Sequence, residues 1–132
     1  MRFLRQASFG PTEQDVAAVI AIGYEDWIDA QIAMPATSQV AILNRLGTVD
    51  DETGHNDRVE AWLESALIGP DQLRQRVAFA LSEIMVVSQQ SGLFAQPYGT
   101  ANYYDLLLNS AFGNFRQLME DVTLSPAMGV YL

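Results

Sequence analysis

Apolar residues recur at intervals of three and four along almost the whole chain, and no convincing stretch alternates between apolar and polar positions. This pattern predicts an all-α fold. Capping residues and helix breakers divide it into seven short helices, at about residues 13–22, 24–33, 38–46, 57–68, 71–87, 100–112 and 115–125. Thr12, Asp57 and Asn114 are the predicted N-caps, because their side chains can accept hydrogen bonds from the first free backbone N–H groups of a helix.

The fifth predicted helix, at about residues 71–87, is apolar on nearly every side; its apolar residues include Leu73, Val77, Phe79, Leu81, Ile84, Met85, Val86 and Val87. A helix of this kind belongs at the centre of a fold. The sequence therefore predicts a compact bundle of about seven short helices around this central helix. Because no linker divides the 132 residues, we expect one all-helical domain over residues 1–132, or the amino-terminal fragment of a larger domain.

The charge balance narrows the range of partners. Seven arginines and no lysine stand against sixteen acidic residues, which gives a formal net charge of -9. Nucleic acid and anionic membrane surfaces are disfavoured, because proteins bind both through clustered cations. No segment reaches the eighteen or so apolar residues of a membrane span. The absence of cysteine excludes disulfides, thiolate metal sites and a thiol nucleophile.

The acidic stretch at residues 50–57 is the first candidate for chemistry. Its carboxylates could offer oxygen ligands to a hard cation such as calcium. Gly54 and Ala61 occupy positions where a calcium-binding loop needs ligands, so we expect a solvated loop that caps the next helix. His55 is the single histidine, which excludes a histidine-rich zinc site, and no nucleophile signature lies near it. We therefore expect no metal and no cofactor.

The second candidate is a buried polar network on the fifth predicted helix. Arg76 and Glu83 are seven residues apart and share one stripe of that helix, whereas Arg74 lies on another side. A buried charge needs a partner or a wet cavity. Asp121 flanks the apolar stripe of the last predicted helix, so we expect a structural ion pair between Arg76 and Asp121. The alternative is a pocket in which Arg76 fixes an anion and Glu83 acts as a base or a ligand.

The third candidate is a set of aromatic residues: Phe94, Tyr98, Tyr103, Tyr104 and Tyr131, with Trp27 and Trp62 elsewhere. Those in the connector at residues 88–99 could stack on a sugar or on another ligand. Such residues more often close a small helical core or meet the rest of a chain, and we expect the same here.

Three stretches of the chain together resemble the bacterial family catalogued as domain of unknown function 1800. They are RFLRQASFGPT at residues 2–12, LRQRVAFALS at residues 73–82, and residues 103–132 with AFGNF at 111–115 and PAMGVYL at 126–132. Ser8 stands where the family would have threonine. Members of the family look several times longer and commonly carry a secretion leader. The resemblance therefore implies the amino-terminal portion of a larger exported protein, periplasmic or extracellular, and it implies no reaction, cofactor or catalytic residue.

The apolar segment at residues 127–132 fits that expectation, since nothing after it closes a helix or a core. We expect it to contact the remainder of a parent chain or another protein, or to join two copies of the chain. Because the chain contains no complete catalytic constellation, the first hypothesis is a helical scaffold or interaction module. The alternative is part of a larger, hydrolase-like enzyme whose active site lies mainly outside these residues, with a contribution from Arg76, Glu83 or the acidic loop.

Overall fold

The computed structural model describes residues 2–46, 54–88, 90 and 92–132, and the secondary structure of these residues is entirely helical. Eight helices follow one another: α1 (Arg2–Ala7), α2 (Glu13–Ala33), α3 (Gln39–Leu46), α4 (His55–Ile68), α5 (Gln72–Ile84), α6 (Pro97–Ser110), α7 (Phe115–Thr123) and α8 (Pro126–Tyr131). The predicted all-α class is confirmed. None of the helices in this described part is long and apolar enough to cross a membrane.

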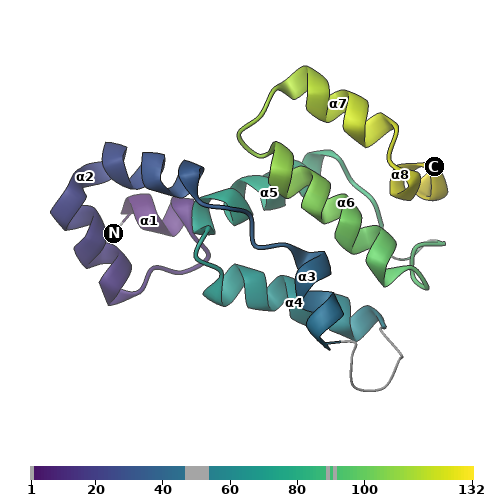
Figure 1. Ribbon diagram of the computed structural model, residues 1–132, viewed down its shortest axis with the longest axis horizontal. Helices are drawn as coiled ribbons and strands as arrows, with labels where there is room; N and C mark the ends of the chain where they lie inside the picture. The colour runs from purple at the N-terminus through teal and green to yellow at the C-terminus, as the bar shows by residue number, and fades with distance from the viewer. Residues whose placement is uncertain (1, 47–53, 89, 91) are drawn as a thin grey trace.

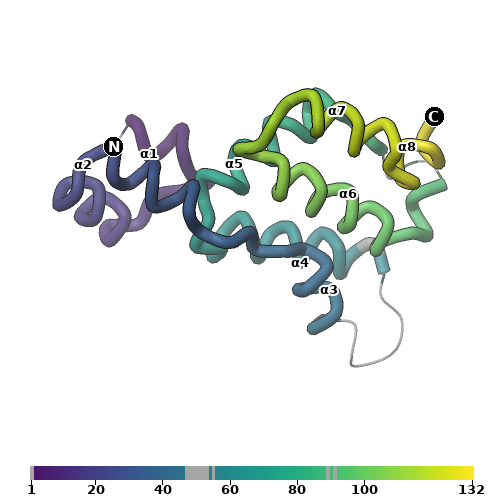
Figure 2. Tube along the Cα trace, turned by 45° about the horizontal axis from the view of Figure 1, so that its top comes forward, coloured from purple at the N-terminus to yellow at the C-terminus, as the bar shows by residue number. Residues whose placement is uncertain are grey.

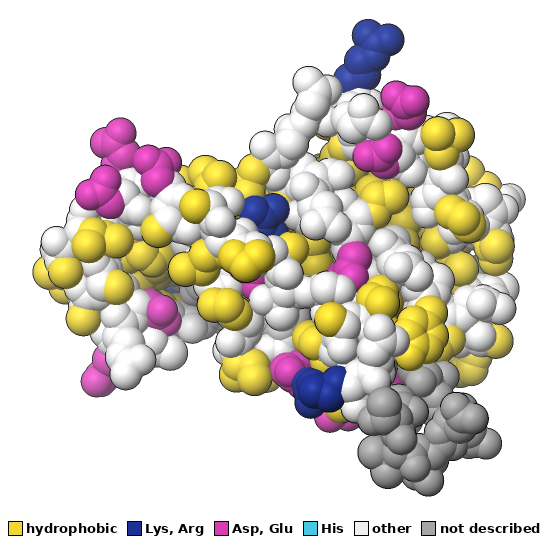
Figure 3. Space-filling model, in the orientation of Figure 1, with side chains coloured by type: hydrophobic (Ala, Val, Ile, Leu, Met, Phe, Trp, Pro, Cys, Tyr) yellow, Lys and Arg dark blue, Asp and Glu magenta, His cyan; other side chains and the backbone are white. Residues whose placement is uncertain are grey.

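The helices form a lobe and a main body (Figure 1). α1 and α2 make the lobe at one end, and α5 connects it to the rest, since α5 packs against α1, α2, α4 and α6. In the main body α6 lies between α3 and α4 on one side and α7 and α8 on the other (Figure 2). On the face seen in Figure 3, acidic side chains gather over the lobe, where Glu25, Asp26 and Asp29 are exposed.

The most buried helix is α6 rather than α5. Its fully or almost fully buried residues are Thr100, Ala101, Tyr103, Tyr104, Leu107 and Leu108, and several of them form the main core cluster with Leu118 and Val122 of α7. The predicted central helix does contact four others, but it ends at Ile84, and the side chain of Ile84 is 71% exposed. The neighbouring helices therefore leave part of the surface of this central helix uncovered.

A second, smaller core holds the lobe together. Leu4, Ala7, Val19 and Trp27 are its buried members, and Phe3 packs edge-on against Trp27 with ring centroids 5.3 Å apart. Within the lobe, residues 13–33 form one helix with a break at Gly23, where φ is 87°. The two helices predicted on either side of this glycine are therefore the two arms of α2. The predicted cap at Thr12 is confirmed, because Thr12 and Asp15 form a reciprocal capping box.

Several helix boundaries differ from the sequence prediction; α6, for example, begins at Pro97 instead of at about residue 100. α4 begins at His55, so Asp57 is its third residue, and the Asp57 carboxylate accepts a hydrogen bond from the backbone N–H of Gly54 at 2.6 Å. Pro126 begins the short helix α8 instead of merely ending α7, because proline lacks an N–H group that the first turn would leave unpaired. Neither α8 nor the equally short α1 was predicted.

Buried polar side chains join the ends of the helices. Asp71, fully buried just before α5, accepts hydrogen bonds from the backbone N–H of Thr37 at 2.9 Å and from its hydroxyl at 2.5 Å. Gln31, near the end of α2, accepts a hydrogen bond from the backbone N–H of Leu73 at 3.0 Å and donates one to the carbonyl of Pro70 at 3.1 Å. These contacts fix the start of α5 against the segment that links α2 to α3.

Candidate functional site

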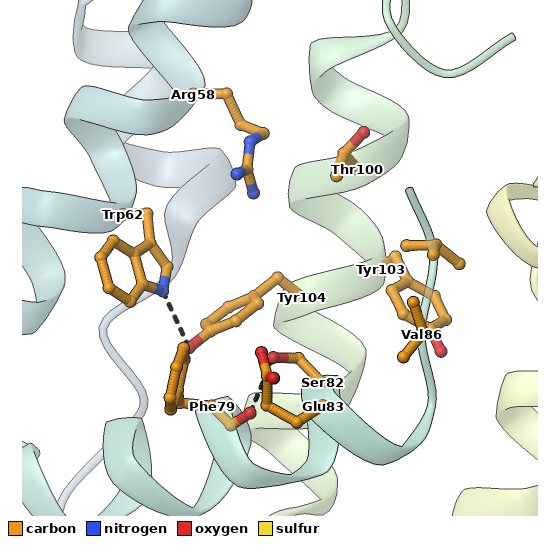
Figure 4. A pocket seen from close by; sticks show the side chains of 10 residues that line it. Arg58, Trp62, Phe79, Ser82, Glu83, Val86, Thr100, Tyr103 and Tyr104 are labelled. Atoms are coloured by element: carbon orange, nitrogen blue, oxygen red, sulfur yellow. Dashed lines mark hydrogen bonds between the residues drawn. The ribbon is translucent and has the colours of Figure 1, made fainter. Parts of the chain in front are cut away.

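A pocket of about 390 Å³ opens between α4, α5 and α6. Its walls are formed by Arg58, Trp62, Phe79, Ser82, Glu83, Val86, Val87, Thr100, Tyr103 and Tyr104. Figure 4 shows these side chains converging from the three helices and from the segment after α5. Pockets that hold small molecules have volumes of roughly 300–1,000 Å³ and combine apolar walls with a few polar groups. The volume and the lining of this pocket match that description.

Helical spacing explains why each helix presents its residues to the pocket. Arg58 and Trp62 are four residues apart on α4 and lie on the same face. Phe79 and Glu83 repeat this spacing on α5, and Thr100 and Tyr104 repeat it on α6. The pocket is the place where these three faces meet.

Arg58 supplies the positive charge of the pocket. Its side chain is half-buried, and its Nε atom is buried without a hydrogen-bond partner. No residue of the described segments forms an ion pair with it. Burial lowers the pKa of Arg58, whereas interaction with Tyr104 raises it, although an arginine stays protonated near neutral pH. An anion placed in the pocket would offset this unfavourable desolvation of the guanidinium.

Tyr104 and Trp62 form the polar and aromatic centre of the site. The indole Nε1 of Trp62 donates a hydrogen bond to the hydroxyl oxygen of Tyr104 at 3.1 Å (Figure 4). Burial raises the pKa of Tyr104, while the hydrogen bond from Trp62 and the charge of Arg58 act in the opposite direction. The phenol therefore stays protonated near neutral pH, and its proton has no acceptor among the described residues. Tyr103 differs, because its hydroxyl already donates to the carbonyl of Met85 at 2.7 Å.

Glu83 supplies a negative charge on the α5 side of the pocket. Its side chain is exposed to solvent and points into the pocket from the wall opposite Arg58 (Figure 4). It makes no ion pair and no hydrogen bond with a residue in the described part of the chain. Ser82, beside it, donates its hydroxyl to the carbonyl of Phe79 at 2.7 Å. The pocket thus contains one cation and one anion that do not pair with each other.

The predicted ion pair between Arg76 and Asp121 is wrong. Arg76 faces α1: its Nε donates to the carbonyl of Gln6 at 3.4 Å, and its guanidinium lies 4.9 Å from the centre of the Phe9 ring. Asp121 accepts a hydrogen bond at 2.9 Å from Gln117, one turn earlier on α7. The two groups are directed to different neighbours, because α7 packs on α6 and α8 whereas this side of α5 packs on α1.

Arg74, another member of the predicted network, joins helix ends and does not reach the pocket. Its guanidinium donates to the carbonyls of Leu108 at 3.1 Å, Ile32 at 3.0 Å and Met34 at 3.1 Å. It also lies 4.8 Å from the centre of the Phe112 ring. Of the four residues in the predicted network, Glu83 alone lines the pocket between α4, α5 and α6.

The remaining candidates are divided between the pocket, the cores and the surface. Trp62, Tyr103 and Tyr104 of the aromatic set line the pocket, whereas Trp27 is buried in the lobe and Phe94 is exposed. In the acidic stretch 50–57, residues 50–53 lie outside the described residues, and the Asp57 carboxylate caps α4. The described segments contain no group of three or more histidine or acidic residues that could hold a metal ion.

Arg58 was not predicted as a site residue, and Glu83 was not predicted to line the same pocket as the aromatic residues. The signal for Arg58 was present, because an arginine four residues before a tryptophan shares the face of a helix with it. The sequence does not contain the further information that this face of α4 meets the Glu83 face of α5. That contact depends on packing between segments about twenty residues apart.

The fold and the site define the class of protein: the described part of the chain is all-helical and has an amphipathic pocket that contains one arginine, one glutamate and several aromatic side chains. The chain belongs to the family described as "Protein of unknown function (DUF1800)", whose model matches residues 2–132. The resemblance predicted from the sequence is thereby confirmed. No curated protein and no solved structure matches the chain.

Proposed function

We propose that the chain is a helical scaffold that holds a binding pocket for a small organic anion between α4, α5 and α6. One observation carries this proposal: the half-buried guanidinium of Arg58 has a buried Nε with no partner and faces the pocket. Taking a charge out of water is unfavourable unless an opposite charge or hydrogen-bond acceptors replace the water. A bound carboxylate would supply both.

The other walls suit the organic part of such a ligand. Trp62 and Phe79 have ring centroids 5.9 Å apart, and Phe9 packs edge-on against both, which holds the two pocket rings in place. Val86 and Val87 extend the apolar surface after α5. The free phenol proton of Tyr104 could donate a second hydrogen bond to a carboxylate held by Arg58, because Tyr104 and Arg58 line the same pocket.

Trp62 provides a direct readout of binding. The chain contains two tryptophans, and Trp27 lies in the core of the lobe. In a Trp27→Phe background, titration with 3-phenylpropanoate should change the fluorescence of Trp62 in a saturable way. Arg58→Met should weaken binding at least tenfold, since a carboxylate loses its cationic partner. Arg116→Met, which alters an exposed arginine on α7, should leave the affinity unchanged.

The Arg58→Lys variant tests whether binding needs only the positive charge or also the planar, forked donors of the guanidinium, because lysine keeps the first and loses the second. We expect an affinity between those of the parent chain and Arg58→Met. A parent chain that binds no carboxylate probe in a saturable way, or equal affinities of 3-phenylpropanoate for the parent and Arg58→Met, would refute the proposal.

A second candidate function is a contribution to a larger, hydrolase-like enzyme. The observation that favours it is that Arg58 and Glu83 line one pocket without closing on each other, so that an anion site and a potential base face the same space. If this is correct, Glu83→Gln should abolish the reaction of a longer chain that includes these residues while leaving the binding of 3-phenylpropanoate in place. Retention of activity in Glu83→Gln would exclude Glu83 as the base.

The expected role of residues 127–132 in contacts with another chain remains a prediction. Met128 and Tyr131 pack against the main core cluster, whereas Val130 and Leu132 are exposed. We expect any association to depend on those two side chains. Sedimentation velocity of the chain and of a Val130→Ser variant would test this: loss of concentration dependence supports the contact, and identical behaviour contradicts it.

A further inference from the structure

The position of Glu83 restricts the kind of anion that the pocket can accept. The Glu83 carboxylate lies on the α5 wall, and the Arg58 guanidinium enters from the α4 wall, with Tyr104 between them in the view of Figure 4. A ligand that carries negative charge alone would be attracted by Arg58 and repelled by Glu83.

We infer that the ligand of this pocket is a zwitterion of the amino acid type, with a carboxylate for Arg58, an ammonium group for Glu83 and an apolar or aromatic side chain. This inference rests on the proposed function, because it presupposes that Arg58 holds the carboxylate of a ligand in the pocket. It adds a second charged group to the ligand and assigns that group to Glu83. Both charges of the pocket would then have a partner.

The aromatic walls favour the ammonium end of such a ligand as well. Trp62, Phe79 and Tyr104 present ring surfaces to the pocket, and ring faces attract ammonium groups. Val86 and Val87 offer apolar contact to a side chain of moderate size. The cavity of about 390 Å³ is large enough for a single amino acid with an aromatic ring.

Three probes of similar shape test the inference by titration calorimetry on the chain. L-phenylalanine carries both charged groups, 3-phenylpropanoate lacks the ammonium group, and 2-phenylethylamine lacks the carboxylate. We expect L-phenylalanine to bind at least tenfold more tightly than either of the others. Glu83→Gln should weaken the binding of L-phenylalanine at least fivefold and leave 3-phenylpropanoate unchanged or bound more tightly. Glu60→Gln, which alters an exposed glutamate on α4, is the matched control and should change neither affinity.

The outcomes distinguish this inference from the proposed function. If 3-phenylpropanoate binds as tightly as L-phenylalanine and Glu83→Gln affects neither, the zwitterion is excluded while the anion pocket stands. If neither carboxylate binds, the proposed function and the inference both fail. If 2-phenylethylamine binds most tightly and depends on Glu83 alone, the pocket is a cation site and both are overturned.

Discussion

Asp105, in the middle of α6, caps the start of α3, a helix that begins 66 residues earlier in the chain. Its carboxylate accepts hydrogen bonds from the backbone N–H groups of Gln39 at 2.7 Å and Val40 at 3.2 Å, and from the hydroxyl of Ser38 at 2.5 Å. A negative charge at this position satisfies free N–H groups and interacts favourably with the positive end of the helix dipole. The same contact ties α3 to the most buried helix of the fold.

Asp105→Asn should therefore destabilise the chain by about 2 kcal/mol, because the amide keeps one acceptor oxygen and loses the charge. Urea denaturation monitored by circular dichroism would measure the loss. Asp121→Asn is the control, since Asp121 contacts Gln117 of its own helix, and its cost should stay below about 0.5 kcal/mol. Equal losses in the two variants would contradict the role of Asp105 as a cap between helices.

The two neighbouring arginines of α5 should differ in their contribution to stability. Arg74→Met removes donors from three carbonyls at helix ends and should cost about 2–3 kcal/mol. Arg76→Met removes one long hydrogen bond and one cation–π contact and should cost about 1 kcal/mol or less. Denaturant melts of both variants compare them directly. A larger loss in Arg76→Met than in Arg74→Met would refute these assignments.

Gly23 should be sensitive to substitution and Gly129 should not. At Gly23, φ is 87° and ψ is 173°, a region that residues with a side chain rarely occupy, so Gly23→Ala should cost about 1–3 kcal/mol. Gly129 lies within α8, and an added Cβ would meet nothing within 4 Å. Gly129→Ala should stabilise the chain by up to about 1 kcal/mol. Thermal melts that show shifts of the same sign in both variants would contradict the prediction.

The stability of the chain should fall at alkaline pH because of buried tyrosines. Burial raises the pKa of Tyr103 and of Tyr104 above the value of about 10 expected in the unfolded chain. The unfolded state therefore releases these protons first. The contribution of these two protonated tyrosines to the free energy of unfolding is complete below about pH 10. It is lost as the pH rises through their higher pKa values in the folded state.

The composition makes this effect easy to isolate. The chain has no lysine and no cysteine, so tyrosines are the side chains that titrate near pH 10. Urea denaturation at pH 8, 10 and 11 should show a smaller loss of free energy of unfolding for Tyr104→Phe than for the parent chain. Tyr24→Phe, which alters an exposed tyrosine, should behave like the parent. Identical pH profiles for the parent and Tyr104→Phe would refute the prediction.

The sequence alone determined those features that depend on a few neighbouring residues. Periodic apolar positions predicted the helical class, Thr12 and Asn114 predicted the caps of α2 and α7, and Gly23 marked the break within α2. Each of these signals acts over one or two turns of backbone, so it can be read without knowing the fold. The motifs that resemble the DUF1800 family span most of the chain, and the family model matches residues 2–132.

Only the tertiary structure decided which polar groups meet. The sequence contains no signal that tells whether Arg76 and Asp121 are in contact. In the structure Arg76 donates to the carbonyl of Gln6 instead. The sequence likewise contains no local signal that Asp105 caps α3. The pocket also depends on tertiary packing. Helical spacing explains which face of its helix carries Arg58, Glu83 or Tyr104, but these faces meet only because of the way α4, α5 and α6 pack. Packing is a collective property of distant segments, because burial rewards any apolar contact and short-range patterns do not specify which helices make it.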